Sequence, residues 1–113
     1  MAFSKQAKLP WFDRTFEVSS EARPYTLRDN GFVNTKPGNF LYERPLETSA
    51  GTKVVLKVTI DKNVETLKIS TVTPNGLNTV NVNNLADNAM VVEKINFIFD
   101  GFVDRNCLVE VNG

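Results

Sequence analysis

The sequence predicts an α+β fold in which antiparallel β-sheets, a meander plus a smaller hairpin sheet, pack on one long C-terminal helix. Three observations predict it: a helical stripe of apolar residues in the last third of the chain, alternating apolar residues in the middle third, and a well-specified hairpin in the first third. With 113 residues, the chain has the size of a single domain, residues 1–113, that can bury about two thirds of its unfolded surface.

The C-terminal helix is predicted from the segment VVEKINFIFDGF, residues 91–102. With a period of two residues, Ile95, Phe97 and Phe99 would lie on one face, as in a half-buried strand. Read in helical turns, one face collects almost all of the apolar residues, namely 91, 92, 95, 98, 99, 102 and 103, and omits only Phe97. Because this pattern holds over four turns, it outweighs the modest helix propensity of Val, Ile and Phe. We expect a helix over residues 88–105 that covers a sheet.

A β-meander is predicted upstream by the parity of the apolar residues. The inward-facing candidates are the even-numbered residues from Val54 to Ile60 in TKVVLKVTID (residues 52–61) and the odd-numbered Leu67 and Ile69 in VETLKISTV (residues 64–72). A two-residue turn at Lys62-Asn63 joins the two strands and sets Val58 opposite Leu67. A second turn, TPNG, leads into a third strand that sets Ile69 opposite Val80. The three strands then share one apolar face.

The first half is predicted to form the smaller hairpin sheet. In TLRDNGF, one helical turn at residues 27–30 ends at Gly31, and Phe32 folds back on Leu27. The turn TKPGNF then joins strands at 32–35 and 40–44. Both faces of this hairpin are partly apolar, so we expect a sheet of its own that the rest of the protein covers. Short strands at 12–18 and 107–111 complete the prediction.

The runs YTLRDNGF, KPGNF and YERPL resemble a small family of proteins from lactic acid bacteria, which is known as a domain of unknown function. The resemblance covers the whole chain. It implies an α+β fold with β-sheets packed on one long helix, similar to TATA-binding-protein-like and S-adenosylmethionine-decarboxylase-like arrangements. It also implies a link to amino-acid metabolism, and it implies no catalytic residues.

Composition excludes several classes of function. Thirteen basic residues balance thirteen acidic ones, so no net field attracts nucleic acid or an anionic membrane. The absence of histidine excludes Ser–His and Cys–His nucleophile pairs and His-ligated metals, and no cofactor is predicted. No Glu-Ser dipeptide is present for self-cleavage to a pyruvoyl group. The single cysteine and the lack of a secretory signal predict a cytoplasmic protein.

The candidate ligand-binding residues are Arg28, Tyr42 and Arg44. They cluster around the turns of the predicted hairpin, and an arginine can hold a carboxylate through two parallel hydrogen bonds. We therefore expect these residues to bind a small anionic metabolite. The alternative is that Arg28 lies on an exposed helical turn without binding a ligand and that Arg44 pairs with Glu43 or Glu47.

Further candidate residues are Lys57, Lys68 and Cys107. The predicted register sets Lys57 directly opposite Lys68 on the outer face of the meander, which forms an anion-binding patch. The alternative is that both ammonium groups simply extend into water. Cys107 is expected to be buried and unreactive, because CLVEV places it on an apolar strand.

These features predict a cytosolic binding or accessory protein that, through the family resemblance, serves amino-acid metabolism. One alternative is a small enzyme acting on an amino-acid-like substrate, which requires a concave pocket with at least two convergent ionisable groups. Another is a homodimeric structural module. The chain is expected to be a monomer or a homodimer, and neither nucleic acid nor a membrane is predicted as a partner.

Overall fold

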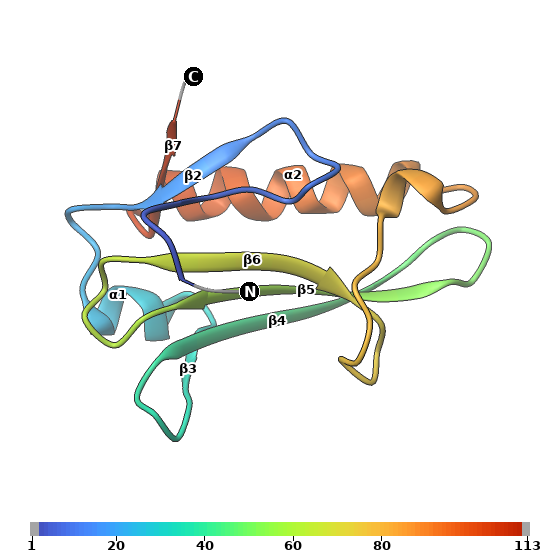
Figure 1. Ribbon diagram of the computed structural model, residues 1–113. Coiled ribbons are helices and arrows are strands. Elements are labelled where there is room, and N and C mark those ends of the chain that lie inside the picture. The colour runs from blue at the N-terminus through green and yellow to red at the C-terminus, as the bar shows by residue number, and fades with distance from the viewer. Residues whose placement is uncertain (1–2, 112–113) are drawn as a thin grey trace.

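The computed structural model describes residues 3–111 and contains two antiparallel sheets and one long C-terminal helix, which confirms the predicted fold class (Figure 1). One sheet has the strand order β1-β2-β7 and the other β3-β4-β5-β6. In chain order the elements are β1 (Gln6–Ala7), β2 (Thr15–Val18), α1 (Pro24–Asp29), β3 (Val33–Asn34), β4 (Phe40–Glu47), β5 (Lys53–Ile60), β6 (Leu67–Val72), the 3-10 helix η1 (Val82–Asn84), α2 (Ala89–Asp104) and β7 (Leu108–Val111).

Helix α2 confirms the helical interpretation of residues 91–102. Its buried residues, Val91, Ile95, Phe99 and Phe102, lie on the predicted stripe, whereas Phe97 outside the stripe is 78% exposed. Their spacing of i, i+4, i+8 and i+11 places them on one face of the helix. Within residues 3–111, no helix is both long enough and apolar enough to cross a membrane.

Both sheets contribute aromatic side chains to the core around α2. The ring of Phe99 stacks on Phe16 of β2 with the centroids 4.4 Å apart. One turn later, the ring of Phe102 lies 5.3 Å from Phe32 and 4.9 Å from Tyr42 of β4. The helix therefore lies against both sheets, with the four-stranded sheet along its length (Figure 1).

The prediction that the hairpin forms a separate sheet is wrong. Strand β4 continues beyond the hairpin and pairs with β5 along its whole length, from Phe40 opposite Ile60 to Glu47 opposite Lys53. Residues 48–52 form a tight connection between β4 and β5, which is closed by a 2.9 Å hydrogen bond from Thr48 N–H to the carbonyl of Thr52. This connection brings β5 directly beside β4. The smaller sheet is instead built from β1, β2 and β7, which come from the two ends of the chain.

The predicted register between β5 and β6 is wrong by two residues. Val58 lies opposite Ile69, whereas Leu67 lies opposite Ile60. The connection is longer than two residues because Asp61 Oδ1 accepts hydrogen bonds from the N–H groups of residues 65 and 66, at 2.8 and 2.9 Å. A slip of two residues keeps each side chain on its face, so the parity of the apolar residues is still correct.

The predicted third meander strand after the turn at 73–76 is also absent. This segment contacts β6 through a bridge between Val72 and Thr79, a 2.8 Å hydrogen bond from Val80 N–H to the carbonyl of Thr71, and a 2.7 Å hydrogen bond from the Thr71 hydroxyl to the carbonyl of Val80. The Asn81 side chain then accepts a hydrogen bond from Asn83 N–H at 3.0 Å and starts η1, which leads the chain away from the sheet. The place of a third strand is taken by β4 on the other side of β5.

The predicted end of α1 is confirmed. Gly31 has a φ of +94°, and the N–H of Phe32 donates to the carbonyl of Leu27 at 3.0 Å, as in a Schellman motif. The helix starts earlier than predicted, at Pro24, because proline suits the first helical position and the Thr26 hydroxyl accepts a hydrogen bond from the N-cap N–H.

Candidate functional site

A cavity of about 610 Å³, the α2–β4 cavity, is formed by side chains of α2, β4 and the end of α1. Cations, carboxylates, amides and apolar groups all contribute to its surface. Its lining residues are Asn30, Tyr42, Arg44, Glu93, Lys94, Asn96, Phe97, Ile98, Asp100, Gly101, Phe102 and Arg105.

The position of β4 explains why Tyr42 and Arg44 reach this cavity. They pair with Val58 and Leu56 of β5, which are fully buried, so all four side chains lie on the face that α2 covers. Strand β3 pairs only with residues 40 and 41, so β4 forms the edge of the sheet from Tyr42 onward. Arg44 lies on the face of the sheet that α2 covers, but it remains exposed because no further strand lies beside β4 at this position.

The structure brings together two of the three predicted ligand-binding residues. Tyr42 and Arg44 line the α2–β4 cavity, whereas Arg28 does not, and its Nη1 lies 3.5 Å from Asn34 Oδ1. Among residues 3–111, the ion pairs within 4.0 Å do not include Arg44, so its predicted alternative pairing with Glu43 or Glu47 is not observed. The guanidinium of Arg44 is therefore available to a ligand.

Arg105 is a cavity residue that the sequence analysis did not select. It is the C-cap of α2, and its Nε donates a hydrogen bond to Asn30 Oδ1 at the end of α1. Lys94, Ile98 and Gly101 precede it at i, i+4 and i+7 spacing, so these residues form a stripe beside the buried face. A glycine in the helix interior, four residues before an arginine at the helix end, is the signal that could have identified it.

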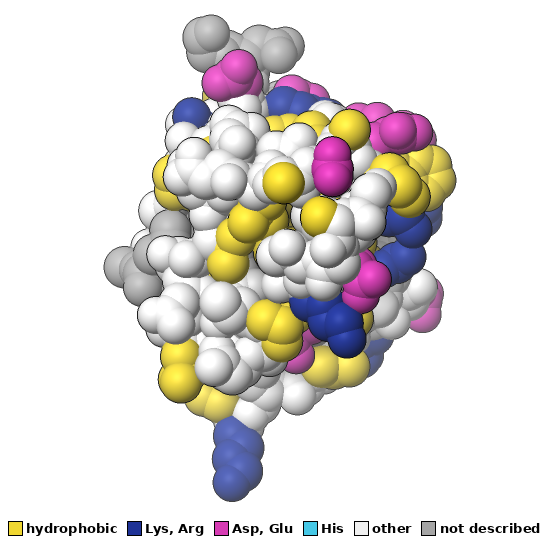
Figure 2. Space-filling view, turned by 90° about the vertical axis from the view of Figure 1, so that its right-hand side faces the viewer, with side chains coloured by type: hydrophobic (Ala, Val, Ile, Leu, Met, Phe, Trp, Pro, Cys, Tyr) yellow, Lys and Arg dark blue, Asp and Glu magenta, His cyan; other side chains and the backbone are white. Residues whose placement is uncertain are grey.

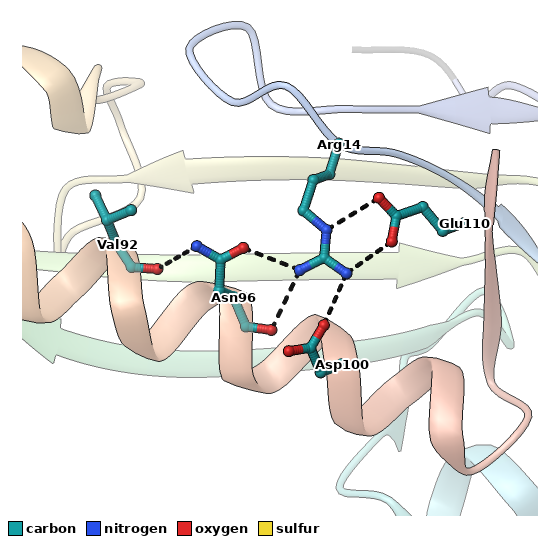
Figure 3. A network of polar contacts seen from close by, with 5 residues as sticks. All are labelled: Arg14, Val92, Asn96, Asp100 and Glu110. Atoms are coloured by element: carbon teal, nitrogen blue, oxygen red, sulfur yellow. Dashed lines mark hydrogen bonds and ion pairs between the residues drawn. The ribbon is translucent and has the colours of Figure 1, made fainter. Parts of the chain in front are cut away.

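A second polar cluster is the Arg14 network (Figure 3). Arg14 donates two hydrogen bonds to the Glu110 carboxylate, at 3.1 and 2.8 Å, and one each to Asp100 Oδ1 at 2.8 Å and Asn96 Oδ1 at 2.9 Å. Its guanidinium also lies 5.2 Å from the ring centroid of Phe16. Asn96 and Asp100 belong to both the network and the cavity, so the network orients part of the cavity wall.

Charge pairing in the network shifts two pKa values. The hydrogen bond from Arg14 lowers the pKa of the Glu110 carboxyl below its usual value. The same hydrogen bond, followed by the one to Asp100, raises the pKa of Arg14, although desolvation opposes the rise. Both groups are therefore ionised at neutral pH. The sequence signal for the network is Arg14 itself, a cation in phase with the apolar face of Phe12 and Phe16.

The corrected register separates the two lysines of the predicted anion patch. Lys57 faces Ser70, while Lys68 faces Thr59 and holds its ammonium 4.8 Å from the ring centroid of Phe3. The lysines are thus diagonal neighbours on the outer face of the sheet. Anion binding at Lys57 and Lys68 stays a prediction.

Cys107 is fully buried, as predicted. Burial raises the pKa of its thiol, and the charge of Arg105 opposes this rise without reversing it. A thiol with a raised pKa is a weak nucleophile at neutral pH. Among residues 3–111, no group of three or more Cys, Asp or Glu side chains is arranged to hold a metal ion.

The side of the molecule where α2 begins shows how the charges are distributed (Figure 2). Basic and acidic side chains lie near one another among polar and scattered hydrophobic groups. This mixture agrees with the equal numbers of basic and acidic residues in the chain. Recognition of a ligand must therefore depend on local geometry rather than on the net charge of the protein.

Comparison with known proteins supports the family resemblance. The model of the DUF1831 family, described as "Putative amino acid metabolism", matches residues 1–109. The crystal structure of a DUF1831 family protein from Lactobacillus plantarum is similar, with 30% sequence identity and a TM-score of 0.85, over 98% of this chain and 99% of that one. Among curated proteins no match was found. The match over nearly the whole chain shows that this protein belongs to the DUF1831 family.

Proposed function

We propose that the protein is a cytosolic binding or accessory protein that holds a small amino-acid-like anion in the α2–β4 cavity. The observation that carries the proposal is the presence of Arg44 and Tyr42 together in this cavity. The family description supports an amino-acid-like ligand. A single cysteine, which is unable to form an internal disulfide, supports the cytosolic location.

The chemistry of the lining residues suits such a ligand. The guanidinium of Arg44 can hold a carboxylate through two parallel hydrogen bonds. The carboxylates of Glu93 and Asp100 can accept from an ammonium group, and Tyr42 and Phe97 offer apolar surface to the rest of the ligand. The cavity volume of about 610 Å³ lies within the range of small-molecule sites, roughly 300–1,000 Å³.

A small ligand is favoured over a peptide added to the edge of the sheet. A strand added beside the cavity would pair with the open edge of β4, where Pro45 lies. Proline has no N–H to donate to a neighbouring strand, and edge prolines are a common means of blocking strand addition. This edge is thus poorly suited to bind an extended peptide through its backbone.

A small enzyme acting on the same class of ligand is the second candidate. The observation that favours it is that Glu93, Lys94 and Asp100 bring ionisable groups to the same cavity as Arg44. Prolonged incubation of protein and ligand, followed by NMR of the small molecule, separates the two candidates. A binding protein leaves the ligand unchanged, whereas an enzyme converts it.

Thermal-shift and calorimetric titrations with the common L-amino acids test the proposal. A bound ligand at a hundred times its Kd should stabilise the wild type by about 2.7 kcal/mol. Arg44→Ala should abolish this effect, because it removes the carboxylate-binding group. Arg28→Ala is the matched control, since it removes the same charge outside the cavity, and it should bind like the wild type. A wild type that no amino acid stabilises would refute the proposal, as would equal losses in both variants.

A further inference from the structure

We infer that Arg105 is a second anion-binding residue of the α2–β4 cavity and that the ligand carries two carboxylates, as an acidic amino acid does. The inference rests on the proposed function, because it concerns the same cavity, and it specifies the class of ligand. Three features of the structure support it: the fixed position of the guanidinium, the glycine beneath it, and its placement relative to Arg44.

The position of the Arg105 guanidinium is fixed from the side of α1. Its Nε donates to Asn30 Oδ1, and Asn30 is itself oriented because its Nδ2 donates to the carbonyl of Thr26 at 2.8 Å. Within residues 3–111, the two Nη nitrogens of Arg105 donate no hydrogen bond to a protein acceptor. A guanidinium held at Nε with both Nη groups available is preorganised to bind a carboxylate.

Gly101 makes room for this guanidinium. A Cβ at position 101 would lie 2.6 Å from Nη2 of Arg105 and 3.2 Å from both its Cζ and Nη1. The backbone of Gly101 does not require glycine, since the positive-φ glycines are at positions 31, 38, 51 and 76. Glycine in a helix interior is unfavourable relative to alanine. The Arg105 guanidinium occupies the space that a Cβ would take, and it would have to move if residue 101 were alanine.

The two arginines reach the cavity from different elements. Arg44 comes from β4, while Arg105 comes from the C-terminal end of α2. A ligand with one carboxylate can form a bidentate pair with only one of the two guanidinium groups. A ligand with a carboxylate at each end engages both. The Glu93 carboxylate and Oδ2 of Asp100, the oxygen that Arg14 does not engage, can accept from its ammonium group.

The test compares ligands that differ in one charge. Calorimetric titration measures the affinity of the wild type for L-glutamate against L-glutamine, and for L-aspartate against L-asparagine. We expect the wild type to prefer the acid in at least one pair by roughly tenfold or more, since a charge-assisted hydrogen-bonded pair contributes at least about that factor. Arg105→Gln should remove the preference, because the affinity for the acid falls to that for the amide.

Gly101→Ala is the variant that separates a ligand-binding role of Arg105 from a purely structural one. The added methyl group should displace the guanidinium and reduce the acid-to-amide preference, while the Tm stays the same or rises because alanine favours the helix. Arg105 could also act only as a cation at the helix C-terminus. In that case Gly101→Ala would leave the preference unchanged, which would overturn the inference.

The remaining outcomes separate this inference from the proposed function. If the wild type binds acids and amides equally, and Arg44→Ala abolishes both, the inference is wrong and the proposed function stands. If no amino acid binds the wild type, both are wrong. Retention of the preference by Arg105→Gln would also overturn the inference.

Discussion

Arg14 joins three segments of the chain through one partly buried guanidinium. Its side chain is 20% exposed, and its acidic partners Asp100 and Glu110 are 61% and 35% exposed. It connects the segment before β2 with α2 and β7. A partly buried arginine needs charged partners to offset the loss of hydration, and a bidentate carboxylate provides the best geometry.

The pKa of Glu110 predicts a specific dependence of stability on pH. Because the hydrogen bond from Arg14 lowers this pKa in the folded state, the pair stabilises the protein above the unfolded pKa of about 4.3. This contribution is lost as the pH falls through the lower, folded pKa. We expect the urea midpoint of the wild type to fall more steeply below about pH 5 than that of Glu110→Gln.

A matched control for this experiment is Glu21→Gln, which removes an exposed glutamate outside the network. Its urea midpoint should follow the wild-type pH profile. Equal slopes for the wild type and Glu110→Gln would show that the Arg14 network contributes nothing to acid stability.

At the scale of elements, the end of α1 shapes the cavity through Gly31. This residue has a φ of +94°, and a Cβ built on it would lie 3.2 Å from Cε1 of Tyr42. Gly51 has a similar φ of +90° but no heavy atom within 4 Å of a built Cβ. Both glycines therefore have a left-handed backbone conformation, but only Gly31 has a side chain, Tyr42, close to where a Cβ would lie.

The comparison of Gly31 with Gly51 predicts how much an alanine at each of these two positions destabilises the protein. Gly51→Ala should destabilise the protein by about 1 kcal/mol, which is the cost of the left-handed backbone for a residue with a Cβ. Gly31→Ala should cost more, because the methyl group also presses on the Tyr42 ring. Urea unfolding of both variants measures the difference. Equal losses would mean that the ring moves aside without cost.

For the whole molecule, Phe99 is the residue through which the two sheets share one core. It is fully buried on α2, its ring stacks on Phe16 of the three-stranded sheet, and it lies 6.4 Å from Phe102 next to the four-stranded sheet. Removing its ring would leave a cavity that neither sheet can fill without moving relative to the helix.

Alanine substitutions of two neighbouring phenylalanines test this role. Phe99→Ala should destabilise the protein by about 3–5 kcal/mol, the usual range for a buried phenylalanine. Phe97→Ala, two residues earlier on the same helix but 78% exposed, should change stability by only about 0.5 kcal/mol or less. Denaturant unfolding of both variants measures the contrast. Similar losses would show that the core is not organised around this face of α2.

The sequence by itself determined those helices and strands that are specified by the spacing of apolar residues along the chain. The stripe of α2 and the parity of β5 and β6 depend only on spacing along the chain, and the end of α1 depends on Gly31 and its neighbours. The choice of Tyr42 and Arg44 as candidate residues also rests on a local signal, because they follow a turn that short-range residues specify. Each of these features requires only contacts between residues near in sequence or a face that must be buried.

Only the tertiary structure decided which strands pair and which side chains meet. Asp61 moved the β5–β6 register by two residues through side-chain hydrogen bonds that parity does not report, and this separated Lys57 from Lys68. Arg105 meets Asn30 across 75 residues, and Arg14 meets Glu110 across 96. Such contacts depend on how two sheets pack on one helix, and no local period encodes that arrangement.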